Sequence, residues 1–144
     1  MKTILFVCTG NTCRSPMAAC LMNALAQSRG REVQALSAGL APWPGAPASE
    51  GAKRSMERRG LSLDGHKAQP VTPQLLHQAD LVVGMSQSHL LHLRALDSSA
   101  ALRAFDDPPI TDPYGGDDAV YEQAARDIQR QLPALLDALK GGTL

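Results

Sequence analysis

Two side chains suited to chemistry on an anion stand six positions apart near the start of the sequence. The segment between them is short and polar, and the stretch reads Cys8-Thr9-Gly10-Asn11-Thr12-Cys13-Arg14-Ser15. A thiolate is a strong nucleophile, and a guanidinium donates two parallel hydrogen bonds to an oxyanion. The spacing therefore predicts attack by the Cys8 sulfur on a tetrahedral anion that Arg14 holds in place.

The flanking sequence places this loop between a strand and a helix. Residues 4–7 form a short, continuous apolar run, as in a strand covered on both faces. Ser15 matches a helix N-cap, and Pro16 then occupies the first helical position. In a loop that joins a strand to a helix N-terminus, successive backbone N–H groups form a nest for a phosphate-like anion.

The residue types inside the loop favour the same chemistry. Gly10 and Asn11 are the two types that best tolerate the left-handed backbone that such wrapping needs. A thiol beside an arginine at a helix N-terminus loses its proton more readily than a free thiol, so we expect Cys8 to be a thiolate near neutral pH. Ser15 is placed to donate a hydrogen bond to its sulfur.

The rest of the chain alternates strands with helices. Such alternation predicts one α/β domain over residues 1–144, with a parallel sheet flanked by helices on both faces. Ligands of these sheets bind beyond the carboxyl ends of the strands, where Cys8 lies. Further strands are expected at 32–37, 81–85 and 102–105, and further helices at 49–59, 72–78, 86–96 and 119–140, the last bent or interrupted by Pro133.

Composition narrows the classes of function. The 144 residues are 44% apolar, and 14 basic side chains balance 14 acidic ones, so no charge footprint indicates nucleic acid or a membrane. The first residues do not resemble an export signal. The three cysteines are odd in number and crowd the first 20 residues, which favours a reduced, cytoplasmic protein without disulfides. They lack a convincing fourth ligand for zinc, so neither metal nor cofactor is expected.

Several other polar residues have ordinary interpretations. His89 and His92, and likewise Arg54, Arg58 and their basic neighbours, are most simply the solvated faces of helices. Composition alone does not select one acid among the aspartates of the segment 106–118. Asp117 and Asp118 are expected to cap the last helix.

The motif and its surroundings resemble one known family. The signature Val7–Pro16 is similar to that of the low-molecular-weight protein tyrosine phosphatases. The likeness continues through Ser37-Ala38-Gly39, Gly65-His66-Lys67-Ala68, Ala79-Asp80-Leu81-Val82 and Asp112-Pro113-Tyr114-Gly115-Gly116.

The resemblance implies a four-stranded parallel sheet and a role for each matching residue. Cys8 would be the nucleophile, Arg14 the phosphate clamp and Asp112 the general acid. The loop residues from Thr9 to Cys13 would bind phosphate. Trp43 and Tyr114 would wall the substrate cleft. The side chains that would hold the shape of the loop are Asn11, Ser15, Ser37 and His66, although His66 by itself reads as a surface histidine.

Residue 12 leaves the substrate open between two phosphoresidues. Many tyrosine-directed members carry Ile where this chain has Thr12, and Thr there resembles the protein-arginine phosphatase branch. Phosphotyrosine in proteins is the family-level expectation, and phosphoarginine is the alternative. A thiol arsenate reductase of this fold would need cysteines in the second half of the chain, and none follows Cys20. A silent phosphoprotein-binding module would lack the nucleophile or the acid, and this chain has both.

Overall fold

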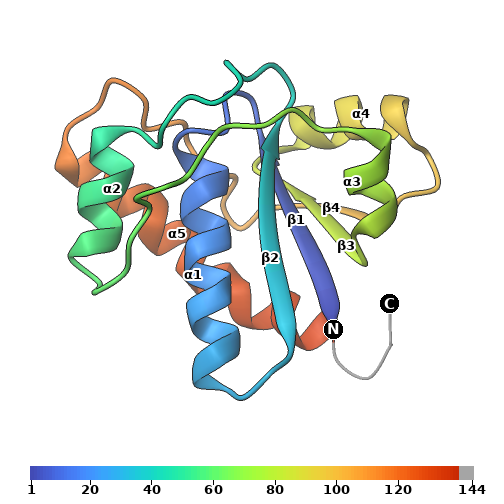
Figure 1. Ribbon diagram of the computed structural model, residues 1–144, viewed down its shortest axis with the longest axis horizontal. Coiled ribbons are helices and arrows are strands. Elements are labelled where there is room, and N and C mark those ends of the chain that lie inside the picture. The colour runs from blue at the N-terminus through green and yellow to red at the C-terminus, as the bar shows by residue number, and fades with distance from the viewer. Residues whose placement is uncertain (140–144) are drawn as a thin grey trace.

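A parallel sheet of four strands in the order β2-β1-β3-β4 forms the centre of the computed structural model, which describes residues 1–139. β1 pairs in parallel with both β2 and β3, and β3 pairs with β4. All carboxyl ends therefore meet at one edge, at the top of Figure 1. The strands are β1 (Lys2–Cys8), β2 (Val33–Gly39), β3 (Leu81–Gly84) and β4 (Leu102–Ala104).

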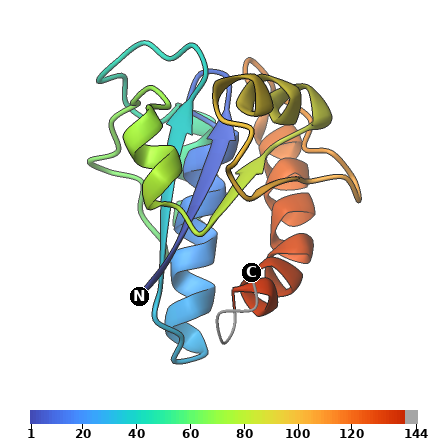
Figure 2. The ribbon, with the colours of Figure 1, turned by 90° about the vertical axis from the view of Figure 1, so that its right-hand side faces the viewer.

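Helices cover both faces of this sheet, as predicted. Figure 1 shows α1 (Arg14–Ser28), α2 (Glu50–Glu57) and α5 (Asp118–Ala138) on one side of the strands. On the other side lie α3 (Pro73–Gln78) and α4 (Gln87–Leu96), and Figure 2 gives the view turned by 90°.

Alternate side chains of β1 feed two separate apolar clusters. Ile4 and Phe6 pack in the cluster under α1, α2 and α5, whereas Leu5 and Val7 pack under α3 and α4. All four are fully buried, which explains why the run is continuously apolar rather than alternating. The nucleophile candidate therefore stands at the end of a strand whose last five residues are all buried.

Two expected helix features are corrected by the structure. The first helix begins at Arg14 with Cys13 at the N-cap position, so Ser15 lies inside the helix rather than capping it. Its hydroxyl is engaged instead by groups of the preceding loop. The last helix is not interrupted at Pro133 but continues to Ala138, and its apolar stripe is buried on both sides of the proline. The expected end at residue 140 lies outside the described residues.

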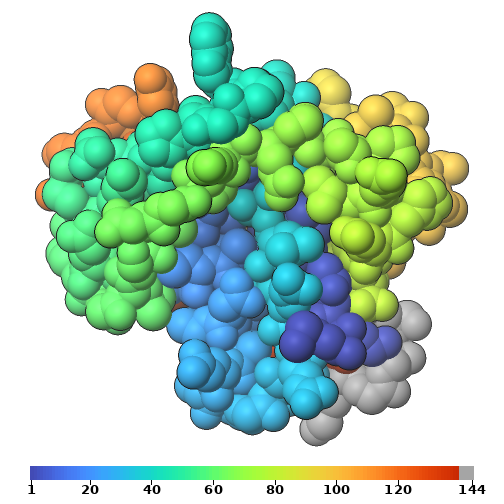
Figure 3. Space-filling model, in the orientation of Figure 1, coloured from blue at the N-terminus to red at the C-terminus, as the bar shows by residue number. Residues whose placement is uncertain are grey.

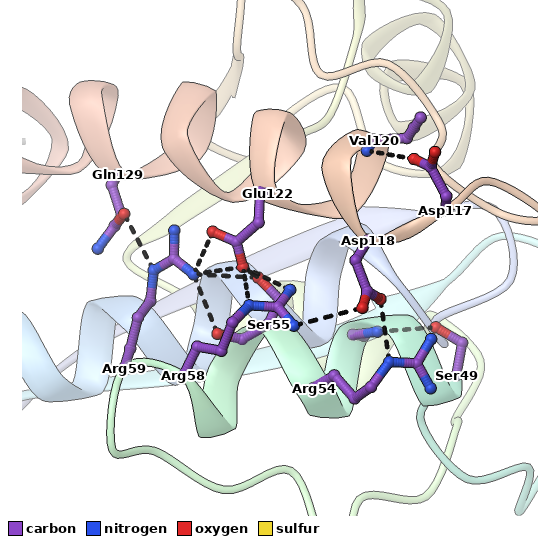
Figure 4. A network of polar contacts seen from close by, with 11 residues as sticks. Ser49, Arg54, Ser55, Arg58, Arg59, Asp117, Asp118, Val120, Glu122 and Gln129 are labelled. Atoms are coloured by element: carbon purple, nitrogen blue, oxygen red, sulfur yellow. Dashed lines mark hydrogen bonds and ion pairs between the residues drawn. The ribbon is translucent and has the colours of Figure 1, made fainter.

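The basic residues around α2 are partly exposed, as expected for Arg54 and Arg58, but they also pair with acidic side chains of α5, which was not expected. Figure 4 shows them reaching α5: Arg54 Nε lies 2.9 Å from Asp118 Oδ1, and Arg58 Nη2 lies 2.6 Å from Glu122 Oε1. Arg59 Nη1 contacts the same glutamate at 2.9 Å. Burial opposes ionisation of Glu122, but hydrogen bonds from Arg58, Ser55 and Arg59 hold its pKa below the usual value. The network fixes α2 against α5, and the sequence on its own pointed to neither partner.

Candidate active site

A pocket of about 260 Å³ opens where β1 ends. Its lining combines the loop after β1 with two residues from the segment before α5, which are distant in sequence. The lining residues are Cys8, Thr9, Gly10, Asn11, Thr12, Cys13, Arg14, Asp112 and Tyr114.

Cys8 is buried at the base of this loop, with 3% of its surface exposed. Its sulfur lies 2.9 Å from the Ser15 hydroxyl oxygen and accepts the backbone N–H of Asn11 at 3.2 Å. Ser15 Oγ accepts a hydrogen bond from the Asn11 side-chain amide at 2.9 Å, and its own hydroxyl proton has two acceptors within reach, the Cys8 sulfur at 2.9 Å and the Ala38 carbonyl oxygen at 3.5 Å. The Asn11 backbone N–H and the Ser15 hydroxyl therefore fix the position of the sulfur at the base of the pocket.

Asn11 is the residue around which the loop closes. Its φ of 56° confirms the predicted left-handed backbone, whereas Gly10 does not adopt a positive φ. The Asn11 amide nitrogen donates to Ser15 and to Ser37, the latter at 3.0 Å, and its amide oxygen accepts the backbone N–H of Gln69 at 2.9 Å. The side chain is fully buried, so these three bonds are shielded from water.

Two neighbouring segments support the loop from outside. His66 Nε2 donates to the Asn11 carbonyl oxygen at 2.7 Å and is half-buried, so the purely surface interpretation of this histidine is wrong. Gly39 has no room for a side chain, because a Cβ there would lie 2.6 Å from the Thr9 carbonyl oxygen. The Ser37-Ala38-Gly39 motif is thus explained by close approach of β2 to the loop.

Arg14 and Asp112 face each other across the pocket. Arg14 is 8% exposed, and its Nη1 donates to the Ile110 carbonyl oxygen at 2.9 Å. Its Nη2 lies 3.9 Å from Asp112 Oδ2. Asp112 Oδ1 accepts the Tyr114 backbone N–H at 3.1 Å, and its carboxyl remains more than half exposed. Asp112 is the aspartate of the segment 106–118 that lines the pocket.

The two expected aromatic walls differ in position. Tyr114 lines the pocket and is 75% exposed. Trp43 is 82% exposed and does not contribute to the lining. Its loop, residues 40–48, lies at the top of the molecule in Figure 3. Trp43 therefore lies outside the pocket that the loop, Asp112 and Tyr114 form, and its role as a wall for a bound substrate stays a prediction.

Cys13 and Thr12 have contacts of their own. The Cys13 sulfur lies 3.2 Å from Ser49 Oγ and 3.4 Å from the Tyr121 hydroxyl, in the apolar layer between α1, α2 and α5. Burial raises the pKa of Tyr121 to about 12, so this hydroxyl keeps its proton. Thr12 Oγ1 lies 3.7 Å from the Cys13 sulfur, and the residue lines the pocket.

His89 is the site residue that sequence reasoning missed. It is 5% exposed rather than solvated, and its ring bridges Thr9 Oγ1, 3.0 Å from Nε2, and Ser86 Oγ, 3.1 Å from Nδ1. Burial, assisted by the charge of Arg14, lowers its pKa to about 4, so the ring is neutral at pH 7. A signal existed: His89 precedes the buried Leu93 by one helical turn, which places both on the same face.

The pocket holds the parts of a covalent transfer reaction. A buried thiol, a guanidinium and a carboxyl meet there, while a loop with a helix N-terminus supplies backbone donors. Within residues 1–139, no cluster of three or more His, Cys, Asp or Glu side chains is arranged to hold a metal ion.

Comparison with known proteins gives a consistent result over nearly the whole chain. The family model described as low molecular weight phosphotyrosine protein phosphatase matches residues 3–143. The chain is 33% identical to a protein-arginine-phosphatase of Bacillus subtilis, over 95% of this chain and 96% of that protein. It is 37% identical to the low molecular weight protein-tyrosine phosphatase A of Mycobacterium bovis, over 93% and 89% respectively.

A solved structure adds the same likeness in three dimensions. It is a mutant of the arginine phosphatase YwlE with a phosphorylated active-site serine, and it superposes with a TM-score of 0.90 at 30% identity, covering 96% of each chain. The chain belongs to the low molecular weight phosphotyrosine protein phosphatase family.

Proposed function

We propose that this protein removes phosphate from phosphotyrosine in protein substrates through a phosphocysteine intermediate on Cys8. The observation that carries the proposal is the convergence of Cys8, Arg14 and Asp112 on one pocket. Each supplies a different requirement of phosphoryl transfer: a nucleophile, a clamp for the phosphoryl oxygens and a proton donor.

In the first step the Cys8 thiolate attacks phosphorus, and the bond from phosphorus to the phenolic oxygen breaks. Asp112, in its protonated form, gives its proton to that oxygen, so the product leaves as a neutral phenol. Arg14 and the backbone N–H groups of the loop hold the other phosphoryl oxygens throughout. The carbonyl of Ile110, which accepts from Nη1 at 2.9 Å, keeps the guanidinium in position before substrate arrives.

In the second step water attacks phosphorus, and the Asp112 carboxylate accepts a proton from that water. The phosphorus–sulfur bond breaks, and Cys8 returns as a thiolate. Ser15 and the Asn11 N–H, at 2.9 and 3.2 Å from the sulfur, stabilise the departing anion. The phosphorylated active-site serine of the related YwlE mutant supports a covalent phosphoenzyme by analogy.

Phosphoarginine is the second candidate substrate, and Thr12 favours it. Thr12 lines the pocket, and its hydroxyl can accept a hydrogen bond from the guanidinium of a bound phosphoarginine, which Ile at this position could not do. Identities of 33% to the arginine phosphatase and 37% to the tyrosine phosphatase do not discriminate between the two substrates.

Parallel hydrolysis of phosphotyrosine and phosphoarginine peptides by one enzyme preparation tests the proposal. Wild type should release phosphate from at least one peptide, and Cys8→Ser should release none while keeping the fold. Cys20→Ser is the matched control, because Cys20 lies outside the pocket lining. Substantial residual activity in Cys8→Ser would refute the mechanism. Thr12→Ile should depress the phosphoarginine rate relative to the phosphotyrosine rate by roughly tenfold, the scale of one lost hydrogen bond to a charged group.

We infer phosphoproteins and free phosphate as the molecules that enter this pocket, and the cytoplasm as the place where it works. The inferred compartment follows from the chemistry, because Cys8 must stay reduced to act and reducing compartments preserve thiols. None of the helices within residues 1–139 has the length and apolar character needed to cross a membrane.

A further inference from the structure

His89 is a buried histidine that the two-step reaction leaves without a role. It belongs to α4, and its ring reaches across to the phosphate loop, where Nε2 meets Thr9 Oγ1 at 3.0 Å. Gly84 makes room for this, since a Cβ at that position would stand 2.9 Å from His89 Cβ. The absence of a side chain at Gly84 thus leaves space for His89, whose imidazole lies against Thr9.

The two hydroxyls that flank the ring restrict its hydrogen-bond pattern. A neutral imidazole has one N–H donor and one bare nitrogen acceptor. Ser86 Oγ lies 3.1 Å from Nδ1 and also 2.9 Å from Ser88 Oγ, so Ser88 can donate to Ser86 while Ser86 donates to Nδ1. In that arrangement Nε2 carries the proton and donates it to Thr9 Oγ1.

The opposite arrangement conflicts with the pocket's anion. If Nδ1 carried the proton, Thr9 would donate its own hydroxyl proton to Nε2 and turn only lone pairs toward the pocket. Lone pairs repel an oxyanion. With the proton on Nε2, the Thr9 hydroxyl has its proton free, and Thr9 is an exposed residue of the pocket lining.

We propose that His89 is a positioning residue that fixes the Thr9 hydroxyl as a hydrogen-bond donor to the oxyanion in the pocket. The relay runs Ser86 O–H to Nδ1, then Nε2–H to Thr9 Oγ1, then Thr9 O–H to the bound oxyanion. The inference deepens the proposed function and rests on it for the identity of the anion. The neutrality of the ring agrees with the relay, since burial and the Arg14 charge lower the pKa of His89 to about 4.

Binding of inorganic phosphate to a set of variants, measured by calorimetry in place of turnover, tests the relay. Thr9→Val removes the hydroxyl at nearly constant shape and should weaken phosphate about tenfold, the scale of one hydrogen bond to a charged group. Thr9→Ser should bind like wild type. His89→Leu should weaken phosphate by a similar factor, and His89→Gln, whose amide donates and accepts in the same way, should recover part of the loss.

The double variant Thr9→Val with His89→Leu separates the relay from independent effects. If His89 acts through Thr9, the double variant should bind phosphate like Thr9→Val alone. The relay would be overturned if the double variant lost affinity for phosphate by the product of the two single losses, or if the single variants bound phosphate like wild type. His92→Leu is the matched control on the same helix, because His92 is exposed and bonds only locally to the Ser88 carbonyl; it should leave phosphate binding unchanged.

Nitrogen-15 NMR of the histidine rings shows which nitrogen of His89 carries the proton in the unmodified protein. It therefore tests the relay even if His89→Leu fails to fold. The proposal requires His89 to be protonated on Nε2 and bare on Nδ1 at pH 7. A ring protonated on Nδ1 would refute it. Both measurements read the pocket without catalysis, so they stay decisive if the hydrolysis experiments above fail.

Discussion

Replacement of Asn11 by Ala and by Gly separates the two jobs of this residue. Its side chain makes three buried hydrogen bonds, to Ser15, Ser37 and the Gln69 N–H, and its backbone stands at a φ of 56°. Alanine loses both the bonds and the tolerance of left-handed backbone. Glycine loses only the bonds.

The magnitudes follow from these contacts. Three lost hydrogen bonds at about 1 kcal/mol each give about 3 kcal/mol for either variant. The left-handed backbone adds about 1 kcal/mol for alanine, and glycine's extra freedom in the unfolded chain offsets part of that difference. Asn11→Ala should therefore lose about 4 kcal/mol and roughly 10 °C in melting temperature. Asn11→Gly should lose somewhat less.

Urea unfolding and aryl phosphate hydrolysis, measured on the same samples, test this reasoning. Both variants should lose about a hundredfold in kcat/KM below their melting points, since small displacements of a catalytic loop cost that much. Variants within 1 kcal/mol of wild type in stability would show that Asn11 does not hold the loop. Equal losses of stability for the Ala and Gly variants would show that the left-handed backbone at residue 11 contributes nothing to the difference between them.

Three further predictions concern other groups of the site. Asp112→Ala should lower kcat by roughly 10²–10⁴-fold, less for substrates with good leaving groups, whereas Asp107→Ala should not; the reverse pattern would reassign the acid. Mild peroxide should oxidise Cys8 to a sulfenic acid that condenses with the Cys13 thiol and releases water; mass spectrometry that finds Cys8 irreversibly oxidised instead would refute this. Because the pKa of His89 is lowered to about 4 in the folded protein, its contribution to the free energy of unfolding should be fully present above pH 6.5. That contribution should be lost as the pH falls from 6.5 toward 4, since the unfolded chain takes up the proton first. Arg14 and His92 contribute to the lowered pKa of His89, whereas the Asp112 carboxylate acts in the opposite direction. Urea unfolding should show that wild type loses about 2 kcal/mol of stability at pH 5 and that His89→Gln does not.

The sequence by itself determined the features that depend on neighbours along the chain. The apolar run 4–7, the loop from Cys8 to Arg14 and the left-handed Asn11 follow from residue type and local spacing. Every predicted strand and helix is present, and most boundaries agree within about two residues. These elements can be predicted from the sequence because helix and strand propensity, capping and hydrophobic periodicity all act between residues a few positions apart.

The tertiary structure alone decided which distant groups meet. It placed Asp112 rather than Asp107 beside Arg14, brought the Gln69 N–H onto Asn11 and turned His89 inward toward the loop. The sequence shows a carboxyl, an amide or an imidazole in the same way whether the side chain lies in a turn, on a solvated face or in a functional site. Only the packing of helices and loops against the sheet sets the distance between such groups, and hydrogen bonds and ion pairs act over a few ångströms.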